Sequence, residues 1–298
     1  MRIHHLNCGT MRPFGGRLVN DGGSLLTGRM VCHCLLIETE AGLVLIDSGI
    51  GSEDMERPPG SLPRVFLRVT RPRLDVEESA VRQVARLGYA PGDVRHIILT
   101  HLDLDHAGGL RDFPRARVHV AEAELAAAMA PVTRNDRGRY RKAQWAHDPD
   151  WVTYGAPDGE RWFGFDAVRQ LTGLPPELLL IPLAGHTRGH TAIAVQSSES
   201  GASRWLLHAG DAYFFHGEVD PARPRSTPVL SWFQNRVQVD GAARVHNQER
   251  LRELAASHSD AVDIFSAHDP VELDRFTRSS RTESSQSGVR RMRGSASL

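Results

Sequence analysis

Residues 100–110, THLDLDHAGGL, decide how this chain is interpreted, because they gather four metal-capable side chains within six positions. These side chains are His101, Asp103, Asp105 and His106, and a Gly-Gly pair follows them. Imidazole nitrogens and carboxylate oxygens are ligands that divalent metals accept in proteins. A tight loop after a strand can aim alternate side chains at two neighbouring points, so one short motif can serve two metal ions.

The same arrangement, an apolar run followed by a turn that carries Asp or His, recurs along the chain. Short apolar runs bounded by Gly, Pro or Asp are typical of buried strands. Residues 76–88, 121–129 and 248–257 have the apolar spacing of helices. Strands mixed with helices predict a layered α and β protein, and polar residues at the strand ends should converge at one sheet edge. The residues at these ends are Asp47, His101, His186, Asp211 and His268.

The composition limits the kinds of partner. Lys+Arg and Asp+Glu both total 36 in 298 residues, so the formal net charge is zero. Such a balance gives no general attraction to nucleic acid or to an anionic membrane. No apolar run approaches the roughly 20 residues that span a bilayer, and the N-terminal MRIHHLNCGTM lacks the apolar core of a signal peptide. We therefore expect a cytoplasmic protein without nucleic-acid or membrane partners; its oligomeric state is left open.

The cysteines fit a reducing compartment. Cys8, Cys32 and Cys34 are too few, and odd in number, for a disulfide framework. Cys32 and Cys34 alternate along an expected strand, and we interpret both as buried packing residues.

Two segments differ from the rest in composition. Residues 140–165 hold seven of the 19 aromatic residues and three of the five tryptophans among charges and turn residues. We expect them to form a lid-like insertion or substrate wall, or else a surface excursion that its own aromatics pack down. Residues 277–298 hold seven serines, five arginines and one glutamate, and we expect a disordered tail. The remaining chain, residues 1–276, is interpreted as the functional domain.

The ordered set of motifs resembles the metallo-β-lactamase superfamily. That family has an HxHxDH motif after a strand, a histidine in a GHTxGH-like turn, a strand-ending aspartate and a late histidine. Here THLDLDH, GHTRGH, HAGD and SAHD follow one another in this order, and the likeness covers roughly residues 30–275. AEAELAAAM and the GDAYF turn have counterparts in the lactonase-type branch. The resemblance implies an α+β fold, an αβ/βα four-layer sandwich with its metal site at one edge between two sheets.

The resemblance also implies a set of ligands for two divalent ions. In the GHTRGH turn the earlier histidine, His186, is expected to be the ligand, in preference to His190. The first ion would take His101, Asp103 and His186, the second Asp105, His106 and His268, and Asp211 would bridge the two.

Asp103 departs from the family pattern, which usually has histidine at this position. Flavodiiron proteins of the same superfamily carry glutamate there, so a carboxylate is admissible. Counting formal charges, two divalent ions with three aspartates and a bridging hydroxide sum to zero, whereas the usual site sums to plus one. Zinc is the expected metal, with manganese or iron as alternatives because of the oxygen-rich first site.

The expected activity is that of a metallo-hydrolase that cleaves an ester or lactone of a small molecule. No separate serine or cysteine nucleophile is evident, so the attacking group would be a hydroxide shared by the two metals. Asp105 would orient it, and Tyr213 would hydrogen-bond a carbonyl or leaving oxygen unless it only packs at its strand end.

Three alternatives remain. Phospho-ester hydrolysis would use the same metals but should bring arginines to the site, and Arg188 is the only obvious nearby one. A flavodiiron-like redox role fits an acidic residue at position 103 but would need a flavin partner domain. A non-catalytic metal-binding module would result if Asp103 prevented the first site from holding its metal ion.

Overall fold

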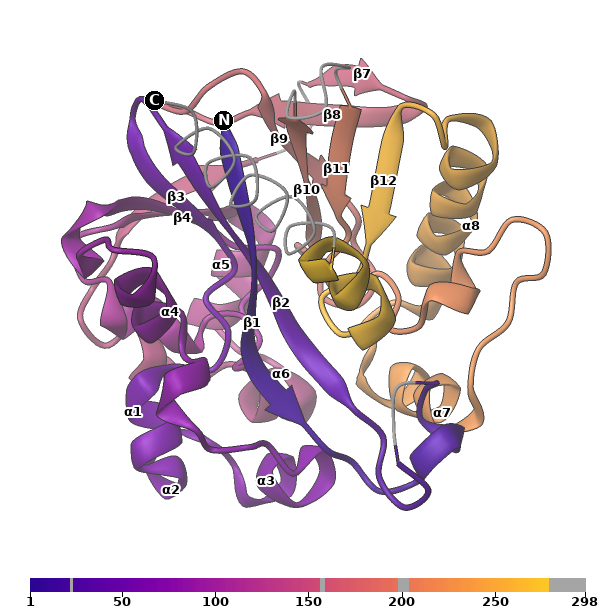
Figure 1. Cartoon of the computed structure of the whole chain (residues 1–298), viewed down its shortest axis with the longest axis horizontal. Coiled ribbons are helices and arrows are strands. Elements are labelled where there is room, and N and C mark those ends of the chain that lie inside the picture. The colour runs from indigo at the N-terminus through magenta and orange to yellow at the C-terminus, as the bar shows by residue number, and fades with distance from the viewer. Residues whose placement is uncertain (22–23, 156–158, 198–203, 279–298) are drawn as a thin grey trace, which may run out of the picture.

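The computed structural model describes residues 1–21, 24–155, 159–197 and 204–278 (Figure 1). Within them, twelve strands form two six-stranded sheets. The first sheet runs in the order β1 (Arg2–Met11), β2 (Met30–Thr39), β3 (Gly42–Ile46), β4 (Val94–Ile98), β5 (Arg117–Ala121), β6 (Asp150–Tyr154). The second runs in the order β12 (Val262–Phe265), β11 (Arg204–His208), β10 (Thr191–Ser197), β9 (Leu178–Pro182), β8 (Phe165–Gln170), β7 (Glu160–Trp162).

Strand direction changes within each sheet. β1, β2 and β3 pair antiparallel, and β3 to β6 pair parallel. In the second sheet all pairs are antiparallel except β11 with β12. The parallel pairs direct the carboxyl ends of β3, β4, β11 and β12 toward turns that carry the predicted site residues.

Helices lie outside the two sheets (Figure 1). The α-helices are α1 (Ser52–Glu56), α2 (Pro58–Ser61), α3 (Arg64–Thr70), α4 (Ala80–Arg86), α5 (Glu122–Met129), α6 (Arg134–Arg139), α7 (Pro228–Val237) and α8 (Gly241–Ser257). The 3₁₀ helices are η1 (Gly16–Leu18), η2 (Val76–Glu78), η3 (Pro91–Asp93), η4 (Gly108–Asp112), η5 (Lys142–Trp145) and η6 (His216–Glu218). Residues 270–278 are also helical.

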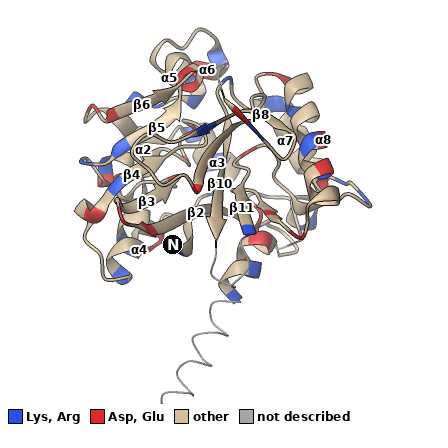
Figure 2. Ribbon diagram, turned by 90° about the horizontal axis from the view of Figure 1, so that it is seen from above, with Lys and Arg blue, Asp and Glu red and all other residues tan. Residues whose placement is uncertain are grey.

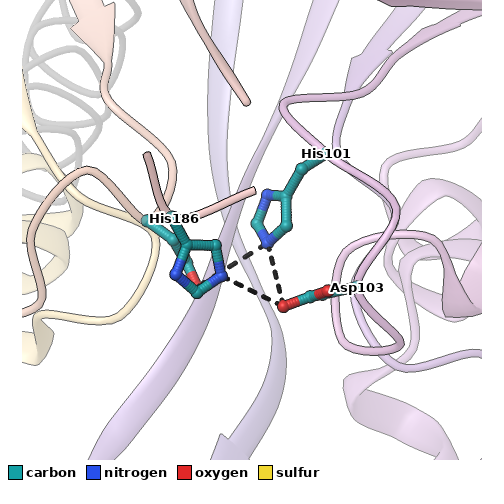
Figure 3. A group of neighbouring side chains, drawn as sticks. His101, Asp103 and His186 are labelled. Atoms are coloured by element: carbon teal, nitrogen blue, oxygen red, sulfur yellow. Dashed lines mark hydrogen bonds and ion pairs between the residues drawn. The ribbon is translucent and has the colours of Figure 1, made fainter. Parts of the chain in front are cut away.

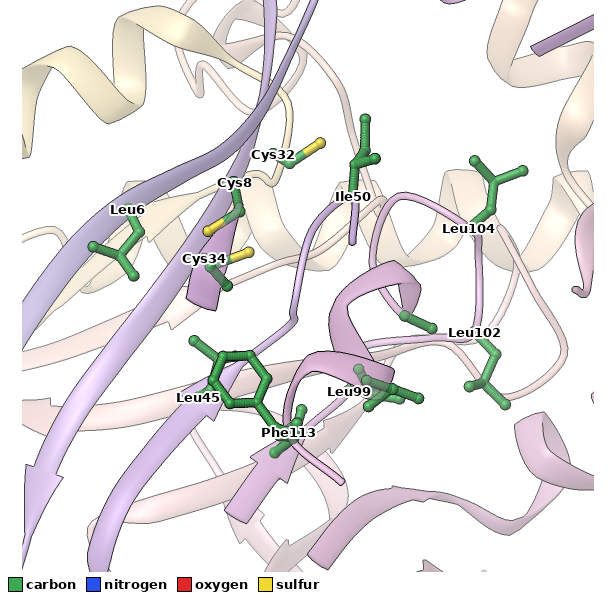
Figure 4. Packing of buried hydrophobic residues seen from close by; sticks show 14 of the residues in the cluster. Leu6, Cys8, Cys32, Cys34, Leu45, Ile50, Leu99, Leu102, Leu104 and Phe113 are labelled. Atoms are coloured by element: carbon green, nitrogen blue, oxygen red, sulfur yellow. The ribbon is translucent and has the colours of Figure 1, made fainter. Parts of the chain in front are cut away.

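Three apolar cores lie between these layers. The alternating side chains of strand β2 contribute to two of them. Side chains alternate across a strand, so Cys32, Cys34 and Leu36 pack into the core between the first sheet and its helices (Figure 4). Leu35 and Ile37 point the other way, into the core between the two sheets. A third core joins the second sheet to α8. The predicted four-layer α+β sandwich is thereby confirmed, and Cys32 and Cys34 are buried and free as expected.

The predicted strands and helices are found with small changes. The apolar runs before Asp47, His101, His186, Asp211 and His268 are β3, β4, β9, β11 and β12. The helix predicted over residues 76–88 is divided into η2 and α4, because the chain is extended at Ser79.

The Gly-Gly pair lets two loops meet beside the site. A Cβ on Gly108 would lie 2.7 Å from the backbone of both Gly49 and Gly51, and one on Gly109 would lie 2.6 Å from the carbonyl oxygen of Ser48. Both glycines begin the 3₁₀ helix η4. The absence of a side chain at both positions permits this close packing.

The aromatic-rich segment, residues 140–165, contributes strands to both sheets. Its described residues include η5, the edge strand β6 of the first sheet, the edge strand β7 of the second and Phe165 at the start of β8. Trp145 is buried in the outer core of the first sheet, and Trp162 in the core beneath α8. The aromatic residues of this segment are distributed over all three cores, because Tyr154 packs against the core between the sheets. Of the predicted tail, residues 279–298 lie outside the described residues.

Acidic and basic residues are interspersed over the surface (Figure 2), as the balanced composition implies. Within the described ranges, no helix combines the length and the apolar character that a bilayer span requires.

Candidate metal centre

Turns from both sheets converge at one edge of the sandwich. The turn after β4 comes from the first sheet, and the turns after β9, β11 and β12 come from the second. They bring together all seven side chains predicted to bind metal, which are His101, Asp103, Asp105, His106, His186, Asp211 and His268.

The first ligand cluster contains one atom each from His101, Asp103, His186 and Asp211. Asp103 Oδ2 lies 3.4 Å from His101 Nε2 and 3.1 Å from His186 Nε2 (Figure 3). Asp211 Oδ2 lies 3.7 Å from His101 Nε2 and 3.3 Å from His186 Nε2. In a tetrahedral site with metal–ligand bonds of about 2.0–2.1 Å, neighbouring ligand atoms are about 3.3–3.4 Å apart. The cluster therefore has the dimensions of a four-coordinate metal site.

The second cluster shares Asp211 with the first. Asp211 Oδ1 lies 3.2 Å from His106 Nε2 and 3.1 Å from His268 Nε2, and the two imidazole nitrogens are 3.3 Å apart. One carboxylate therefore presents Oδ2 to the first cluster and Oδ1 to the second, as a bridging ligand would. Burial acts to raise the pKa of Asp211, but the surrounding histidines, His268 foremost, hold it well below its ordinary value.

Asp105 stands at the open side of the second cluster, with Oδ2 3.6 Å from His268 Nε2. The side chains of Asp103 and Asp105 are 17% and 13% exposed, whereas those of the other five candidate ligands are at most 4% exposed. Solvent and substrate would therefore reach the centre past these two carboxylates.

Cys32 also belongs to this region, which the sequence did not indicate. Its Sγ, a carboxylate oxygen of Asp105 and a ring nitrogen of His268 lie within 4.8 Å of one another. Burial, followed by the negative charge of Asp105, raises the pKa of the Cys32 thiol well above its ordinary value. A periodic strand pattern predicts that a residue is buried but does not reveal which loop packs above it.

Three of the histidines are oriented by acceptors behind them. His106 Nδ1 lies 2.8 Å from Asp47 Oδ2, and His268 Nδ1 lies 2.7 Å from the carbonyl oxygen of Val31. His101 Nδ1 lies 3.0 Å from Thr100 Oγ1, which in turn donates to Asp47. With a proton on each Nδ1, each Nε2 lone pair faces the clusters, which is the arrangement that metal-binding histidines require.

Two polar atoms at the centre have no hydrogen-bond partner among the described residues. Among the described residues, His101 Nε2 and Asp211 Oδ1 are buried without a hydrogen bond. Buried polar atoms are almost always satisfied in folded proteins, so two such atoms aimed into ligand clusters fit divalent cations.

His190 has a structural role, in agreement with the preference for His186. Its Nε2 accepts the backbone N–H of Asp211 at 2.9 Å, and its Nδ1 lies 3.0 Å from the carbonyl oxygen of Leu183. Both ring nitrogens are used to join the GHTRGH turn to the turn after β11.

Tyr213 does not face the centre and packs at its strand end, which was the second expectation for this residue. Its hydroxyl donates to Glu272 Oε1 at 2.8 Å, and the side chain is completely buried. The next residue, Phe214, turns toward the ligands and stacks on the His268 ring with 5.2 Å between centroids. No periodicity fixes the direction of side chains in a turn, so the sequence left both roles of Tyr213 open.

Arg139, at the end of α6, is the arginine that contacts the candidate ligands, and no motif in the sequence pointed to it. Its Nη1 donates to Asp103 Oδ2 at 2.7 Å and lies 3.0 Å from His186 Nε2. Arg188 instead pairs with Asp136. The guanidinium adds one positive charge beside Asp103, so the formal charge of a doubly loaded centre is plus one again and not zero. Arg139 lies 36 residues from Asp103 in sequence, and no local motif connects them.

A four-layer sandwich with paired His/Asp clusters at its edge defines a metallo-hydrolase architecture. The sequence model of the Metallo-beta-lactamase superfamily matches residues 27–257. The chain belongs to the metallo-β-lactamase superfamily, which confirms the resemblance seen in the sequence.

The relatives include hydrolases of this kind. A Mycobacterium tuberculosis protein named "Probable metallo-hydrolase" is 42% identical over 270 residues, which are 91% of this chain and 81% of the relative. The N-acyl homoserine lactonase AttM of Agrobacterium fabrum is 26% identical over 278 residues, 93% of this chain and 97% of the relative. Among solved structures, an N-acyl homoserine lactone hydrolase with product bound at its catalytic metal centre matches with a TM-score of 0.66. It is 20% identical, and the match covers 92% of this chain and 95% of that one; this likeness bears on the fold.

Proposed function

We propose that the protein is a metal-dependent hydrolase of a lactone or ester, with a small molecule as substrate. The observation that carries this proposal is the Asp211 carboxylate, which offers one oxygen to each of two ligand clusters. The relatives named N-acyl homoserine lactonase support a lactone as the substrate class.

The residues would divide the chemistry as follows. Divalent ions, when bound, would polarise the carbonyl of the substrate and activate a water molecule. Zinc is the expected ion, with two per chain at saturation. Asp105, partly exposed at the mouth, would accept a hydrogen bond from the attacking water and so orient it. Phe214, buried and stacked on His268, would hold the imidazole ring of that ligand in place.

Phospho-ester hydrolysis is supported less well by the arginines of the site. A phosphoryl group would need a guanidinium free to donate to its oxygens. Arg139 directs Nη1 to Asp103 and Nη2 to the carbonyl oxygen of Val237, and Arg188 pairs with Asp136.

The test is a substrate panel on one preparation of protein, stripped of metal with a chelator and then reloaded with zinc, manganese or iron. We expect hydrolysis of N-acyl homoserine lactones, simple lactones or aryl esters only after reloading. Asp105→Asn should lower kcat by about 10²–10⁴-fold. Asp112→Asn changes a carboxyl that binds Ser52 away from the clusters and serves as the control. Turnover of phosphodiesters alone, or undiminished turnover by Asp105→Asn, would contradict the proposal.

A further inference from the structure

Arg139 brings a fixed cation to the atoms that would hold the first metal. Its side chain is 5% exposed, and Nη1 contacts both Asp103 Oδ2 and His186 Nε2. Nη2 donates to the carbonyl oxygen of Val237. The guanidinium is therefore held from both sides and directed into the first cluster.

The two acceptors of Arg139 Nη1 differ in whether they keep a free lone pair for a metal ion. A carboxylate oxygen has more than one lone pair, so Asp103 Oδ2 can accept from Arg139 and still coordinate an ion. A neutral imidazole has a single lone pair on its unprotonated nitrogen. His186 Nε2 cannot accept the Arg139 hydrogen bond and bind a metal at the same time.

We propose that Arg139 competes with the metal for His186, so that the two metal positions are unequal and the one formed by Asp105, His106, Asp211 and His268 fills first. This inference rests on the proposed metal-dependent function. The first position fills only when the guanidinium turns away from His186, which makes Arg139 a positioning residue that sets metal loading.

A second observation points the same way. His106 and His268 each have Nδ1 held by an acceptor, Asp47 and the Val31 carbonyl. His186 Nδ1 is buried and has no hydrogen-bond partner among the described residues. A partner on the other ring nitrogen fixes the orientation of a histidine ligand and raises its basicity. His186 lacks such a partner, so it is less well oriented for metal binding than His106 and His268.

Arg139 also changes what a replacement of Asp103 should do. Together the carboxylate and the guanidinium carry no net charge, like one neutral histidine. Asp103→His alone would restore the family motif but leave the guanidinium against three histidines, so it should weaken the first position. The double replacement Asp103→His with Arg139→Met removes both charges and should recover it. Such reversal in a double-mutant cycle is a sign of direct coupling.

The experiment is a metal titration of the full chain, freed of metal, with zinc and manganese in competition with a chromophoric chelator. The wild type should bind two ions per chain in two separated steps. Arg139→Met should tighten the weaker step by about ten-fold or more, because a positive charge next to the ion is removed. Arg137→Met is the matched control, since Arg137 lies on the same helix and binds the carbonyls of Val132 and Thr133.

Each result decides the question. Thermal unfolding of the metal-free variants verifies that they fold. Should Arg139→Met fold and leave both steps unchanged, or weaken the first position, the inference about Arg139 fails while the metal centre stands. Additive effects of Asp103→His and Arg139→Met on metal affinity would also overturn the inference. If the wild type binds no ion at saturation, the inference and the proposed function fail together.

Discussion

Replacing Asp47 by Asn tests whether the residues behind the ligands prepare the centre. Asp47 Oδ1 accepts the backbone N–H of Thr100, and Oδ2 accepts the Thr100 hydroxyl and His106 Nδ1–H, each at 2.8 Å. Asp47 has a left-handed backbone with φ of 52°. Asn tolerates that conformation well, so the substitution changes hydrogen bonding without adding strain.

An amide can satisfy only part of this network. If its oxygen faces the Thr100 N–H, its NH₂ faces His106 Nδ1–H. The His106 proton must then move to Nε2, so this nitrogen no longer has a lone pair to bind a metal ion beside Asp211. If the amide is turned the other way, its NH₂ meets the Thr100 N–H. An unsatisfied buried donor costs about 1–3 kcal/mol of stability, and loss of such an outer partner typically lowers metal affinity by about 10–100-fold.

The assay is chelator competition at fixed pH on the wild type, Asp47→Asn and the control Asp112→Asn. Asp112 accepts from the N–H and hydroxyl of Ser52, much as Asp47 accepts from those of Thr100. We expect weaker metal binding for Asp47→Asn only, mainly in the step assigned to His106. Equal affinities in all three proteins would refute the view that Asp47 sets the His106 tautomer.

Three further predictions follow from the buried residues. Burial, followed by the nearby Asp269 charge, raises the pKa of Glu272 from 4.5 to about 8. The folded chain thus holds this proton more tightly than the unfolded chain, and the stability it contributes is present below pH 4.5 and lost as pH rises to about 8. Glu272→Gln should therefore gain in Tm relative to wild type between pH 5 and 8; a constant difference would contradict the assignment. Gly108→Ala should destabilise by about 1–3 kcal/mol, measured by urea unfolding, because its Cβ would meet backbone at 2.7 Å; unchanged stability would show that the loops can separate. Trp162→Ala should cost about 3–5 kcal/mol with metal affinity unchanged, whereas an altered substrate preference at wild-type stability would favour a substrate wall.

The sequence predicted well those features that depend on local patterns of apolar and polar residues. Asp47, His101, His186, Asp211 and His268 all follow short apolar strands, and strand ends converge whatever the details of the loops. The same pattern predicted a layered α and β protein, and the family resemblance implied the four-layer sandwich.

The parts that it missed depend on loop direction and on distant contacts. Tyr213 and Phe214 are neighbours in a turn, and only the packed structure decides that Phe214 faces His268. Arg139 reaches Asp103 across the packed loops. The aromatics of residues 140–165 were grouped by sequence, yet Trp145 and Trp162 belong to different cores.

The central claim is that one carboxylate, Asp211, joins two metal positions. Metal content per chain at saturating zinc, by elemental analysis after removal of free metal, tests it most directly in wild type, Asp211→Ala and the control Asp112→Ala. The wild type and the control should retain up to two ions, and Asp211→Ala should lose most of both, because each cluster loses an oxygen ligand. Full occupancy in Asp211→Ala would contradict the claim.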